Sequence, residues 1–479
     1  MRLSITKFMR FTGQFLGFLL GLAVLTGCDN VTDGIVYATN PNGSDNRTII
    51  IDYVGNKTDV IIPNSVTTIG DGAFSDKKLT NVTIPDSVII IGDSAFANNK
   101  LSSITIPTSV TTIERKAFMS NRLTSVSLPD SVTTIGNSAF YGNYLTSVNL
   151  PDSLFTIGKG VFSHNYLTKV NLPDSLTSIG DQAFFHNYLI NVDIPASVTT
   201  IGGKAFMFNR LTSVSLPDML TTIGKEAFMN NRLTSVSLPD RLTTIEESTF
   251  MYNKLNSVAI PDSVTAIGRG AFFGNGLSSL TLSGSVTSIG ELAFGNNNLN
   301  SLTIPDSVIT IDDRAFMDNR LTSVAIPYSI VTIGAGAFAY NSLTSVSISD
   351  SVVTISAAAF ARNNLTSVTI PNSVTNVETS AFSYNQLTSV TIPSSVVTIG
   401  KQAFKNNELT SVTIPDSVVT IGREAFKSNK LTSLVIPDSV VSIGREAFEN
   451  NDLTSVTIPD SWFMMDTSMF GKNVAIQRN

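Results

Sequence analysis

The chain has 479 residues with 31 basic and 37 acidic side chains, which gives a net charge of −6. Only 14% of its residues are charged, against about 25% in typical soluble domains. No basic run is present, which argues against nucleic-acid binding because phosphate contacts need clustered Lys and Arg. Two His and one Cys leave little material for catalysis or metal binding, so we expect no enzyme, no cofactor and no metal site.

Residues 1–27 predict a secretory signal. Three basic residues lie in the first ten positions, an apolar stretch covers residues 11–25, and the sequence LTGC ends at Cys28. This arrangement resembles the lipobox of bacterial lipoproteins, and the resemblance implies that Cys28 is acylated and becomes the new N-terminus. The alternatives are an ordinary cleaved signal and an uncleaved membrane helix, for which the apolar stretch is short. Lipidation predicts an extracytoplasmic, membrane-anchored protein, and with Cys28 used no disulfide can form.

Two short segments follow the signal. Residues 28–47 are mostly polar and rich in Gly, Asn and Asp, and they predict a flexible tether after the lipidated Cys. Residues 48–56 belong to an apolar stretch that predicts a cap strand leading into the first repeat.

From residue 57 onward the sequence repeats with a fixed period. Phe recurs at one interval from Phe74 and Phe96 to Phe470, which gives 19 copies without an insertion or deletion. We call each copy a coil, and we number its positions as slots 1 to 22 of the consensus LTSVTIPDSVxTIGxxAFxxNx, so that Phe occupies slot 18. A fixed period of this length predicts a solenoid, with regular coils over residues 57–452 and a degenerate last coil and cap over residues 453–479.

Coil 17, residues 409–430, shows what each slot predicts. Slots 3 to 6 alternate polar and apolar residues and predict a short strand, which Pro415 ends because it lacks an N–H. Val418 and Ile421 predict a second extended arm that points two side chains inward. Phe426 is expected on a short helical turn as the largest buried side chain. Asn429 in slot 21 is expected to bond the backbone of adjacent coils.

The pattern LxxVxI-P…IGxxAFxxN resembles the BspA-like variant of the leucine-rich repeat over residues 57–474. It departs from that variant in slot 21, where many such repeats carry Cys. The resemblance implies a right-handed solenoid with a parallel β-sheet on one face, short second strands and short helical turns. It also implies adhesion or binding of macromolecules rather than catalysis. In the last coil the bulky Trp462 predicts a cap, since nothing stacks on a terminal coil.

Slots 19, 20 and 22 break the consensus between coils 3 and 10 with aromatic, Met and basic residues. These residue types are enriched in protein interfaces. We expect a stripe along one edge of the solenoid that either binds a partner or covers the turn of the next coil. The partner-binding candidates, which include one strand-face residue, are Tyr141, Tyr144, His164, Tyr166, Lys169, Phe185, His186, Tyr188, Phe208, Arg210, Arg232 and Tyr252.

Other exposed columns leave further interpretations open. Slots 3 and 5 are rich in Ser and Thr, which suits a soluble strand face, a glycan-binding surface or, less well, an ice-binding array. Slot 8 is Asp in twelve coils, which suits turn chemistry or weak calcium binding. His164 and His186 share slot 20 in adjacent coils, but no carboxylate column accompanies them, so they predict a weak metal site at most.

The sequence therefore predicts a monomeric, lipid-anchored solenoid that binds a protein or glycan ligand through its surface and does not bind nucleic acid. The alternative class is a structural spacer of the cell envelope without a specific ligand, because each coil needs only its neighbours to be stable.

Overall fold

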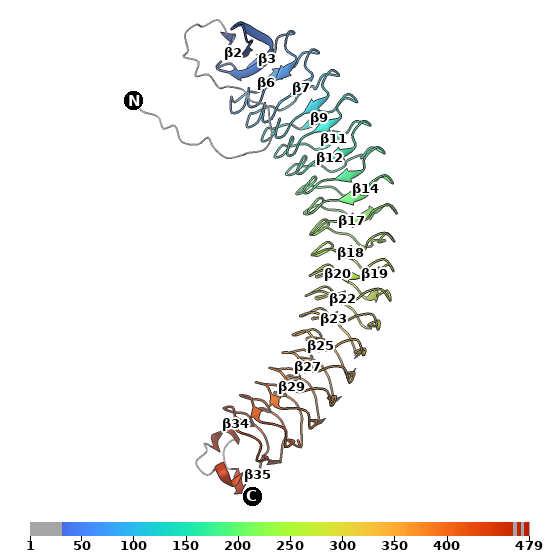
Figure 1. Cartoon of the computed structure of the whole chain (residues 1–479), viewed down its shortest axis with the longest axis vertical. Helices are drawn as coiled ribbons and strands as arrows, with labels where there is room; N and C mark the ends of the chain where they lie inside the picture. The colour runs from blue at the N-terminus through green and yellow to red at the C-terminus, as the bar shows by residue number, and fades with distance from the viewer. Residues whose placement is uncertain (1–30, 463–466, 471–473, 479) are drawn as a thin grey trace, which may run out of the picture.

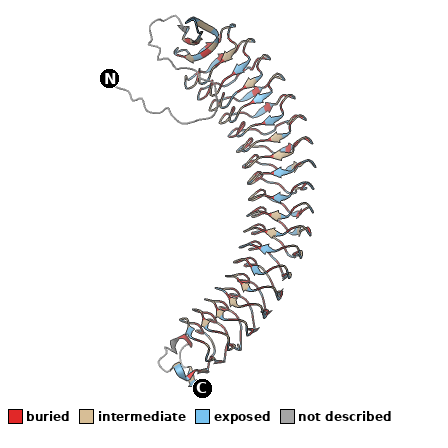
Figure 2. Cartoon of the chain, viewed as in Figure 1, coloured by how far each residue is buried: buried red, intermediate tan, exposed pale blue. Residues whose placement is uncertain are grey.

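The computed structural model describes residues 31–462, 467–470 and 474–478, which stack into one arched rod (Figure 1). The signal segment and Cys28 lie outside the described residues, as do residues 463–466 of the last coil. Buried and exposed positions recur from coil to coil along the whole rod (Figure 2). The chain is thus a parallel β-solenoid with the predicted period.

Most coils contribute two short strands, and equivalent strands of adjacent coils pair in parallel and slot by slot, as Ile157 with Ile179 and Val192 with Val214. The strands of slots 12 and 13 are β5 Thr68–Ile69, β7 Ile90–Ile91, β8 Thr112–Ile113, β10 Thr134–Ile135, β12 Thr156–Ile157, β13 Ser178–Ile179, β15 Thr200–Ile201, β17 Thr222–Ile223, β18 Thr244–Ile245, β20 Ala266–Ile267, β22 Ser288–Ile289, β23 Thr310–Ile311, β25 Thr332–Ile333, β27 Thr354–Ile355, β29 Asn376–Val377, β31 Thr398–Ile399, β32 Thr420–Ile421 and β34 Ser442–Ile443. The strands of slots 3 to 5 are β4 Asp59–Ile61, β6 Asn81–Thr83, β9 Ser125–Ser127, β11 Ser147–Asn149, β14 Asn191–Asp193, β16 Ser213–Ser215, β19 Ser257–Ala259, β21 Ser279–Thr281, β24 Ser323–Ala325, β26 Ser345–Ser347, β28 Ser367–Thr369, β30 Ser389–Thr391 and β33 Ser433–Val435.

The longest sheets are made by slots 12 and 13 rather than by slots 3 to 6, where we expected the main strand. The former give ladders of up to ten strands, whereas the latter mostly pair two by two. The slot-14 Gly extends the longer ladder, as when the Gly422 N–H donates to the Ile399 carbonyl at 2.7 Å. A Cβ on Gly422 would lie 2.4 Å from the Lys401 nitrogen, so this Gly permits a close approach of two backbones.

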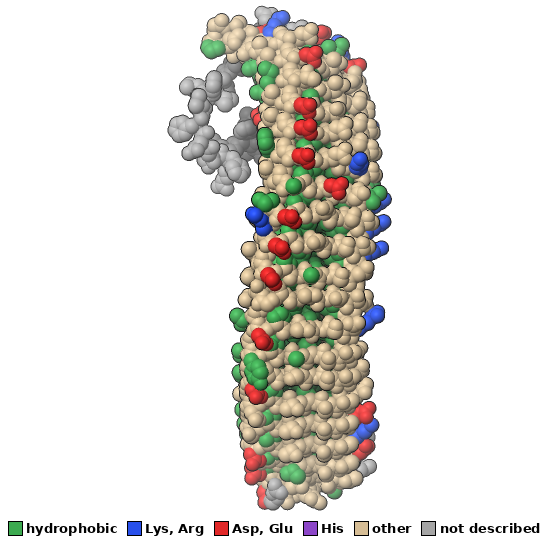
Figure 3. All heavy atoms as spheres, turned by 90° about the vertical axis from the view of Figure 1, so that its right-hand side faces the viewer, with side chains coloured by type: hydrophobic (Ala, Val, Ile, Leu, Met, Phe, Trp, Pro, Cys, Tyr) green, Lys and Arg blue, Asp and Glu red, His purple; other side chains and the backbone are tan. Residues whose placement is uncertain are grey.

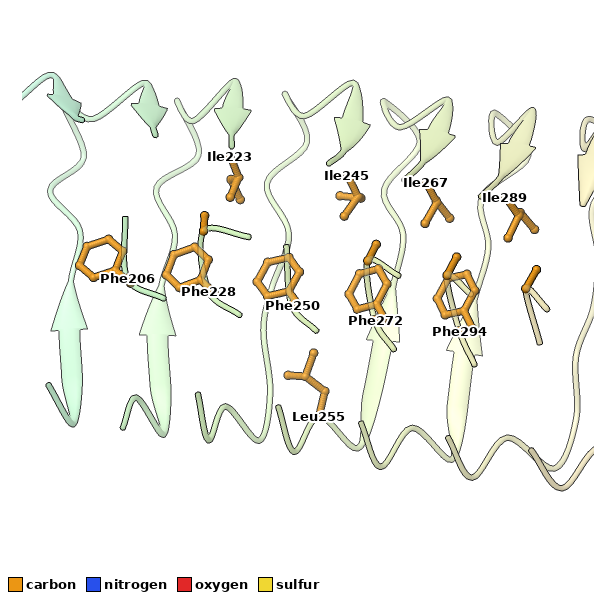
Figure 4. Packing of buried hydrophobic residues seen from close by; sticks show 14 of the residues in the cluster. Phe206, Ile223, Phe228, Ile245, Phe250, Leu255, Ile267, Phe272, Ile289 and Phe294 are labelled. Atoms are coloured by element: carbon orange, nitrogen blue, oxygen red, sulfur yellow. The ribbon is translucent and has the colours of Figure 1, made fainter. Parts of the chain in front are cut away.

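The core is a continuous column of phenylalanine rings along the rod. Each slot-18 ring from Phe74 to Phe448 is fully buried. Adjacent rings lie nearly parallel, with centroids 5.3 Å apart at Phe74 and Phe96 and 5.8 Å apart at Phe448 and Phe470. Figure 4 shows these rings between the two strand columns, with the slot-13 isoleucines such as Ile245 pointing toward them. The predicted inward slots are therefore confirmed.

A column of Asn side chains runs beside the phenylalanines and bonds three backbone groups per coil. The Asn231 amide donates to the carbonyls of Phe206 and Phe228 at 2.9 and 3.1 Å, and its oxygen accepts the Leu211 N–H at 3.0 Å. The same three bonds recur at every slot-21 Asn from Asn99 to Asn451. The predicted backbone-bonding role of this column is confirmed.

The segment that carries Phe426 is a run of tight turns, and the predicted short helical turn is wrong. Slots 16 and 20 adopt left-handed φ, which is 58° at Glu424 and 59° at Ser428, and left-handed residues interrupt a right-handed helix. The alternation points every second N–H at the next coil, as with the Phe426 N–H, which donates to the Ala447 carbonyl at 2.7 Å. The turn thus forms a third ladder between coils.

The N-terminal cap begins earlier than expected, so the predicted tether over residues 28–47 is wrong for its described part. The strands β1 Val31–Thr32, β2 Ile35–Thr39 and β3 Asp45–Tyr53 pair antiparallel, and β3 continues into the solenoid by pairing with β5. Ile35 and Tyr37 are buried. Tyr53 lies 5.4 Å from Phe74 and ends the ring column, so apolar residues within a polar segment cover the first coil.

The other end is covered by a different set of elements. The strand β35 Ser455–Ile458 pairs in parallel with β33 and with the final strand β36 Ala475–Arg478. Two short 3-10 turns, η2 Asp460–Trp462 and η3 Thr467–Phe470, lie between β35 and β36. Trp462 is half-buried against the core.

Candidate binding surface

The candidate residues lie on the loop that follows the phenylalanine column and leads into the strand of slots 3 to 5. Their side chains divide by slot, because slot 19 turns toward the core and slots 20 and 22 turn toward solvent. Met207 in slot 19 is 7% exposed, whereas its neighbour Phe208 in slot 20 is 43% exposed. The expected edge stripe therefore consists of two exposed columns of side chains, in slots 20 and 22, and one half-buried column, in slot 19.

Slot 22 forms a tyrosine column that ends in an arginine. The rings of Tyr144 and Tyr166 lie 5.7 Å apart, and those of Tyr166 and Tyr188 lie 5.6 Å apart. The Arg210 guanidinium lies 4.1 Å from the centre of the Tyr188 ring, a cation–π contact that favours both groups. We call these four residues the tyrosine column.

Slots 19 and 20 together form a second cluster beside it. The imidazoles of His164 and His186 stack 5.1 Å apart, and Tyr141 lies 4.9 Å from His164. Phe185 contacts His164 at 5.2 Å and Phe208 at 5.8 Å. These five predicted residues thus form one connected group of rings.

The backbone of slot 20 is left-handed in every described coil, which makes bulky residues there unusual. Most coils place Gly, Asn, Asp or Ser at this slot, the types that tolerate a left-handed conformation best. Phe208 and Tyr252 nevertheless hold φ of 57° and 55°. A large ring in this conformation costs about 1 kcal/mol, so these coils keep rings where smaller residues would fold more easily.

The two histidines are a poor metal site. Burial lowers the pKa of His164, and the charge of His186 lowers it further. In the described part of the chain, no group of three or more His, Cys, Asp or Glu side chains could hold a metal ion.

The strand face departs from the Ser and Thr pattern in coils 5 to 7. Slots 3 and 5 there carry Asn149, Lys169, Asn171, Asn191 and Asp193, all of them partly or fully exposed. Asn149 and Asn171 are bridge partners on adjacent coils. Slot 22 leads directly into this face, so Tyr144, Tyr166 and Tyr188 stand at the entrance of the same three coils.

The structure unites most of the predicted residues but not all of them. Arg232 makes no ring contact or ion pair within the described residues. Tyr252 lies apart from the main cluster and contacts Phe273 edge-on at 5.7 Å. Sequence reasoning missed Arg362, whose guanidinium lies 5.1 Å from the Tyr340 ring and 4.3 Å from the Tyr384 ring. The succession of Tyr, Arg and Tyr in slot 20 of three adjacent coils was the signal for it.

The slot-8 aspartates form a separate acidic column, which runs along the face shown in Figure 3. The neighbouring Ser carries the turn chemistry, since the Ser417 hydroxyl donates to the Val396 carbonyl at 2.7 Å. The Asp416 carboxylate accepts no hydrogen bond from the described residues, so the expectation that these aspartates stabilise the turn is wrong for this residue.

A solenoid with short parallel strands, an inner phenylalanine column and an Asn ladder defines a leucine-rich-repeat protein. The chain belongs to the family described as BspA type leucine rich repeat region (6 copies), which matches residues 52–167, 133–256, 243–366 and 353–477. No curated protein matches the chain.

Solved structures of leucine-rich-repeat proteins match the chain at low sequence identity. A leucine-rich repeat protein from Bacteroides ovatus ATCC 8483 is 20% identical over 94% of this chain and 100% of that chain, with a TM-score of 0.36. A leucine rich cell surface protein from Faecalibacterium prausnitzii A2-165 is 24% identical over 74% and 91% of the two chains, with a TM-score of 0.37. The pneumococcal vaccine antigen PcpA is 17% identical over 92% and 82%, with a TM-score of 0.32.

The described residues contain no helix with the length and apolar character that a membrane crossing requires.

Proposed function

We propose that the chain is a lipid-anchored, extracytoplasmic binding protein whose partner docks on coils 4 to 7. The observation that carries this proposal is that three groups of unusual residues lie in the same neighbouring coils. The tyrosine column, the ring cluster of slots 19 and 20 and the polar strand-face residues from Asn149 to Asp193 all lie within coils 4 to 7, although they occupy different slots. Random drift between copies would scatter such changes over 19 coils.

A protein partner fits this surface better than a glycan. A sugar stacks on an aromatic side chain through the open face of the ring. Both faces of Tyr166 are covered, by Tyr144 and by Tyr188, and Arg210 covers the outer face of Tyr188. What the column offers is ring edges, hydroxyl groups and a guanidinium, which are the groups that dominate protein hot spots.

The test replaces Tyr166, Tyr188 and Arg210 with Ala together. We expect the affinity for a protein partner recovered from the extracellular environment to fall at least about thirtyfold, as for loss of a hot spot. The matched control is Tyr328→Ala, which removes a tyrosine that is 76% exposed in slot 8. Equal loss in both variants, or no loss in the triple variant, would contradict the proposal, and loss of binding to a glycan array alone would favour a sugar ligand.

The anchor and the location are tested separately. Cys28→Ser should release the protein from the membrane fraction and abolish incorporation of a labelled fatty acid. Protease added to intact cells should digest the solenoid if it faces outward. The rival function is a spacer without catalytic or binding activity, and it predicts that no partner is recovered reproducibly by the unaltered chain.

A further inference from the structure

A stripe of exposed apolar side chains runs along slot 11 in the C-terminal third of the rod. Upstream of coil 12 this slot is Thr in nine of eleven coils, the exceptions being Ile89 and Phe155. From coil 12 to coil 18 it is Ile or Val in every coil but one, which has Thr375. The members of this apolar stripe are Ile309 (58% exposed), Val331 (52%), Val353 (40%), Val397 (42%), Val419 (39%) and Val441 (75%).

Charged side chains of opposite sign flank the last coils of the stripe. Slot 8 precedes slot 11 in the coil and carries Asp416 and Asp438, and slot 15 follows it and carries Lys401, Arg423 and Arg445. The stripe therefore lies between an acidic and a basic row. Like charges stacked at the coil spacing repel one another.

Several upstream coils instead pair opposite signs within slot 15. Arg115 pairs with Asp93 at 2.6 Å, and Lys225 pairs with Glu247 at 3.4 Å. Three basic residues follow one another only in coils 16 to 18. In slot 15, a run of three like charges thus occurs only beside the exposed apolar stripe.

The basic row is only partly neutralised inside the chain. Arg423 contacts Glu424 at 3.0 Å and Arg445 contacts Glu446 at 3.2 Å, but their side chains stay 55% and 82% exposed. Lys401, Asp416 and Asp438 form no ion pair within the described residues. Exposed guanidinium groups and free carboxylates therefore remain accessible to a partner.

We propose that this stripe is where two copies of the chain associate in parallel. A half-turn about an axis parallel to the rod lays one stripe on the other and brings the acidic row of each copy against the basic row of its partner. A half-turn about an axis across the rod would make the copies antiparallel and place like rows against each other. The charge pattern therefore favours a second copy in this direction over the monomer expected from the sequence.

The size of the surface suits a reversible dimer. Seven coils at the strand spacing of about 4.8 Å span roughly 34 Å, and a strip about 15 Å wide buries on the order of 1,000 Å² in total, near the lower limit for specific interfaces. Two arched rods (Figure 1) can touch over only part of their length. The apolar stripe likewise covers only part of the length of the rod, which agrees with such a limited contact.

Cysteine cross-linking in the full chain tests the direction. Cys28→Ser removes the natural thiol, and Val397→Cys, Val419→Cys or Val441→Cys then introduces one thiol each. With a short bismaleimide, each variant should give a covalent dimer through its own counterpart. Thr133→Cys, an exposed slot-11 position in coil 4, is the control and should stay monomeric. Cross-links that require a mixture of Val397→Cys and Val441→Cys would overturn the parallel arrangement.

The mass in solution tests the stripe itself. A chain with Val397→Thr, Val419→Thr and Val441→Thr keeps the residue that upstream coils use, so the coils should fold unchanged by circular dichroism. Sedimentation equilibrium should show a dimer for the unaltered chain and at least about a tenfold larger dissociation constant for this variant. A monomeric unaltered chain at every concentration, or an unchanged constant in the variant, would overturn the proposal.

Discussion

The Asn of slot 21 shows why one residue type can be required in almost every coil. Its side chain is short and carries both a donor group and an acceptor group. Two carbonyls and one N–H of the turn point at it in each coil, and Asn231 bonds all three from a buried position. Asp lacks the donors and Gln is longer, so neither replaces all three bonds. This role was predictable from the sequence because the column is nearly invariant along the chain.

Replacing Asn231 with Ala should destabilise the solenoid strongly. The change leaves the Phe206 and Phe228 carbonyls and the Leu211 N–H buried without partners, and we expect a loss of about 2–4 kcal/mol. The urea midpoint measured by circular dichroism checks this. Asn256→Ala is the control, since Asn256 is exposed in slot 2, and it should change stability by less than about 0.5 kcal/mol. Equal effects would refute the bonding role.

Other features at this scale could not be predicted from the sequence. The left-handed conformation of Phe208 depends on the direction that its N–H must take toward the next coil, where it donates to the Met229 carbonyl at 3.1 Å. Nothing in a Phe residue signals positive φ. The stacking of Arg362 between Tyr340 and Tyr384, by contrast, was predictable, because Tyr, Arg and Tyr follow one another in slot 20 of three adjacent coils.

At the scale of the element, the turn after slot 14 was predicted wrongly for a physical reason. Gly, Ala and Phe in sequence permit a helical turn, and propensity alone does not exclude one. Stacked coils need every second N–H directed at the neighbour, and this requirement overrides the local preference. The strands of slots 12 and 13 were underestimated similarly, because their ladder gains from the close backbone approach at Gly422.

The same turns carry a buried ion network near the C-terminus that makes stability depend on pH. Lys405 donates a hydrogen bond to the Glu424 carboxylate and Gln402 donates another at 2.9 Å. Together they lower the pKa of Glu424 from 4.5 to about 2. A lowered pKa stabilises the fold fully above the ordinary value, and this contribution is lost as the pH falls from 4.5 toward 2.

Glu424→Gln should therefore be less stable than the unaltered chain at neutral pH, and the difference in Tm should shrink as the pH falls through this window. Thermal melting between pH 7 and pH 2 measures it. Asp240→Asn, in coil 9 and away from the apolar stripe, removes an exposed carboxylate without a hydrogen bond from the described residues, and it should leave the acid sensitivity unchanged. A difference between Glu424→Gln and the unaltered chain that is constant with pH would contradict the assignment.

At the scale of the whole molecule, the sequence predicts the interior better than the ends. Because the coils repeat, the assignment of buried and exposed slots made for coil 17 held for the other coils. The N-terminal cap is a unique segment whose polar composition suggested a tether, and only Ile35 and Tyr37 hinted at its buried side. Their partners lie in β3 and the first coils, so the contact that orders them is not local.

Deleting one whole coil should preserve the rod, and this tests the stacking principle directly. Each coil contacts mainly its two neighbours, and coil 11, residues 277–298, carries no predicted partner-binding residue. Its removal brings coil 10 against coil 12 with every slot still aligned, so the Phe272 ring should stack on Phe316. We expect an unchanged circular dichroism spectrum, retained partner binding and a body shorter by about 4.8 Å in small-angle scattering. Deleting only residues 277–287 would place slot 12 against slot 1 and expose apolar side chains, so that variant should aggregate or unfold. If the half-coil deletion were tolerated as well as the whole one, register between coils would not be what holds the rod together.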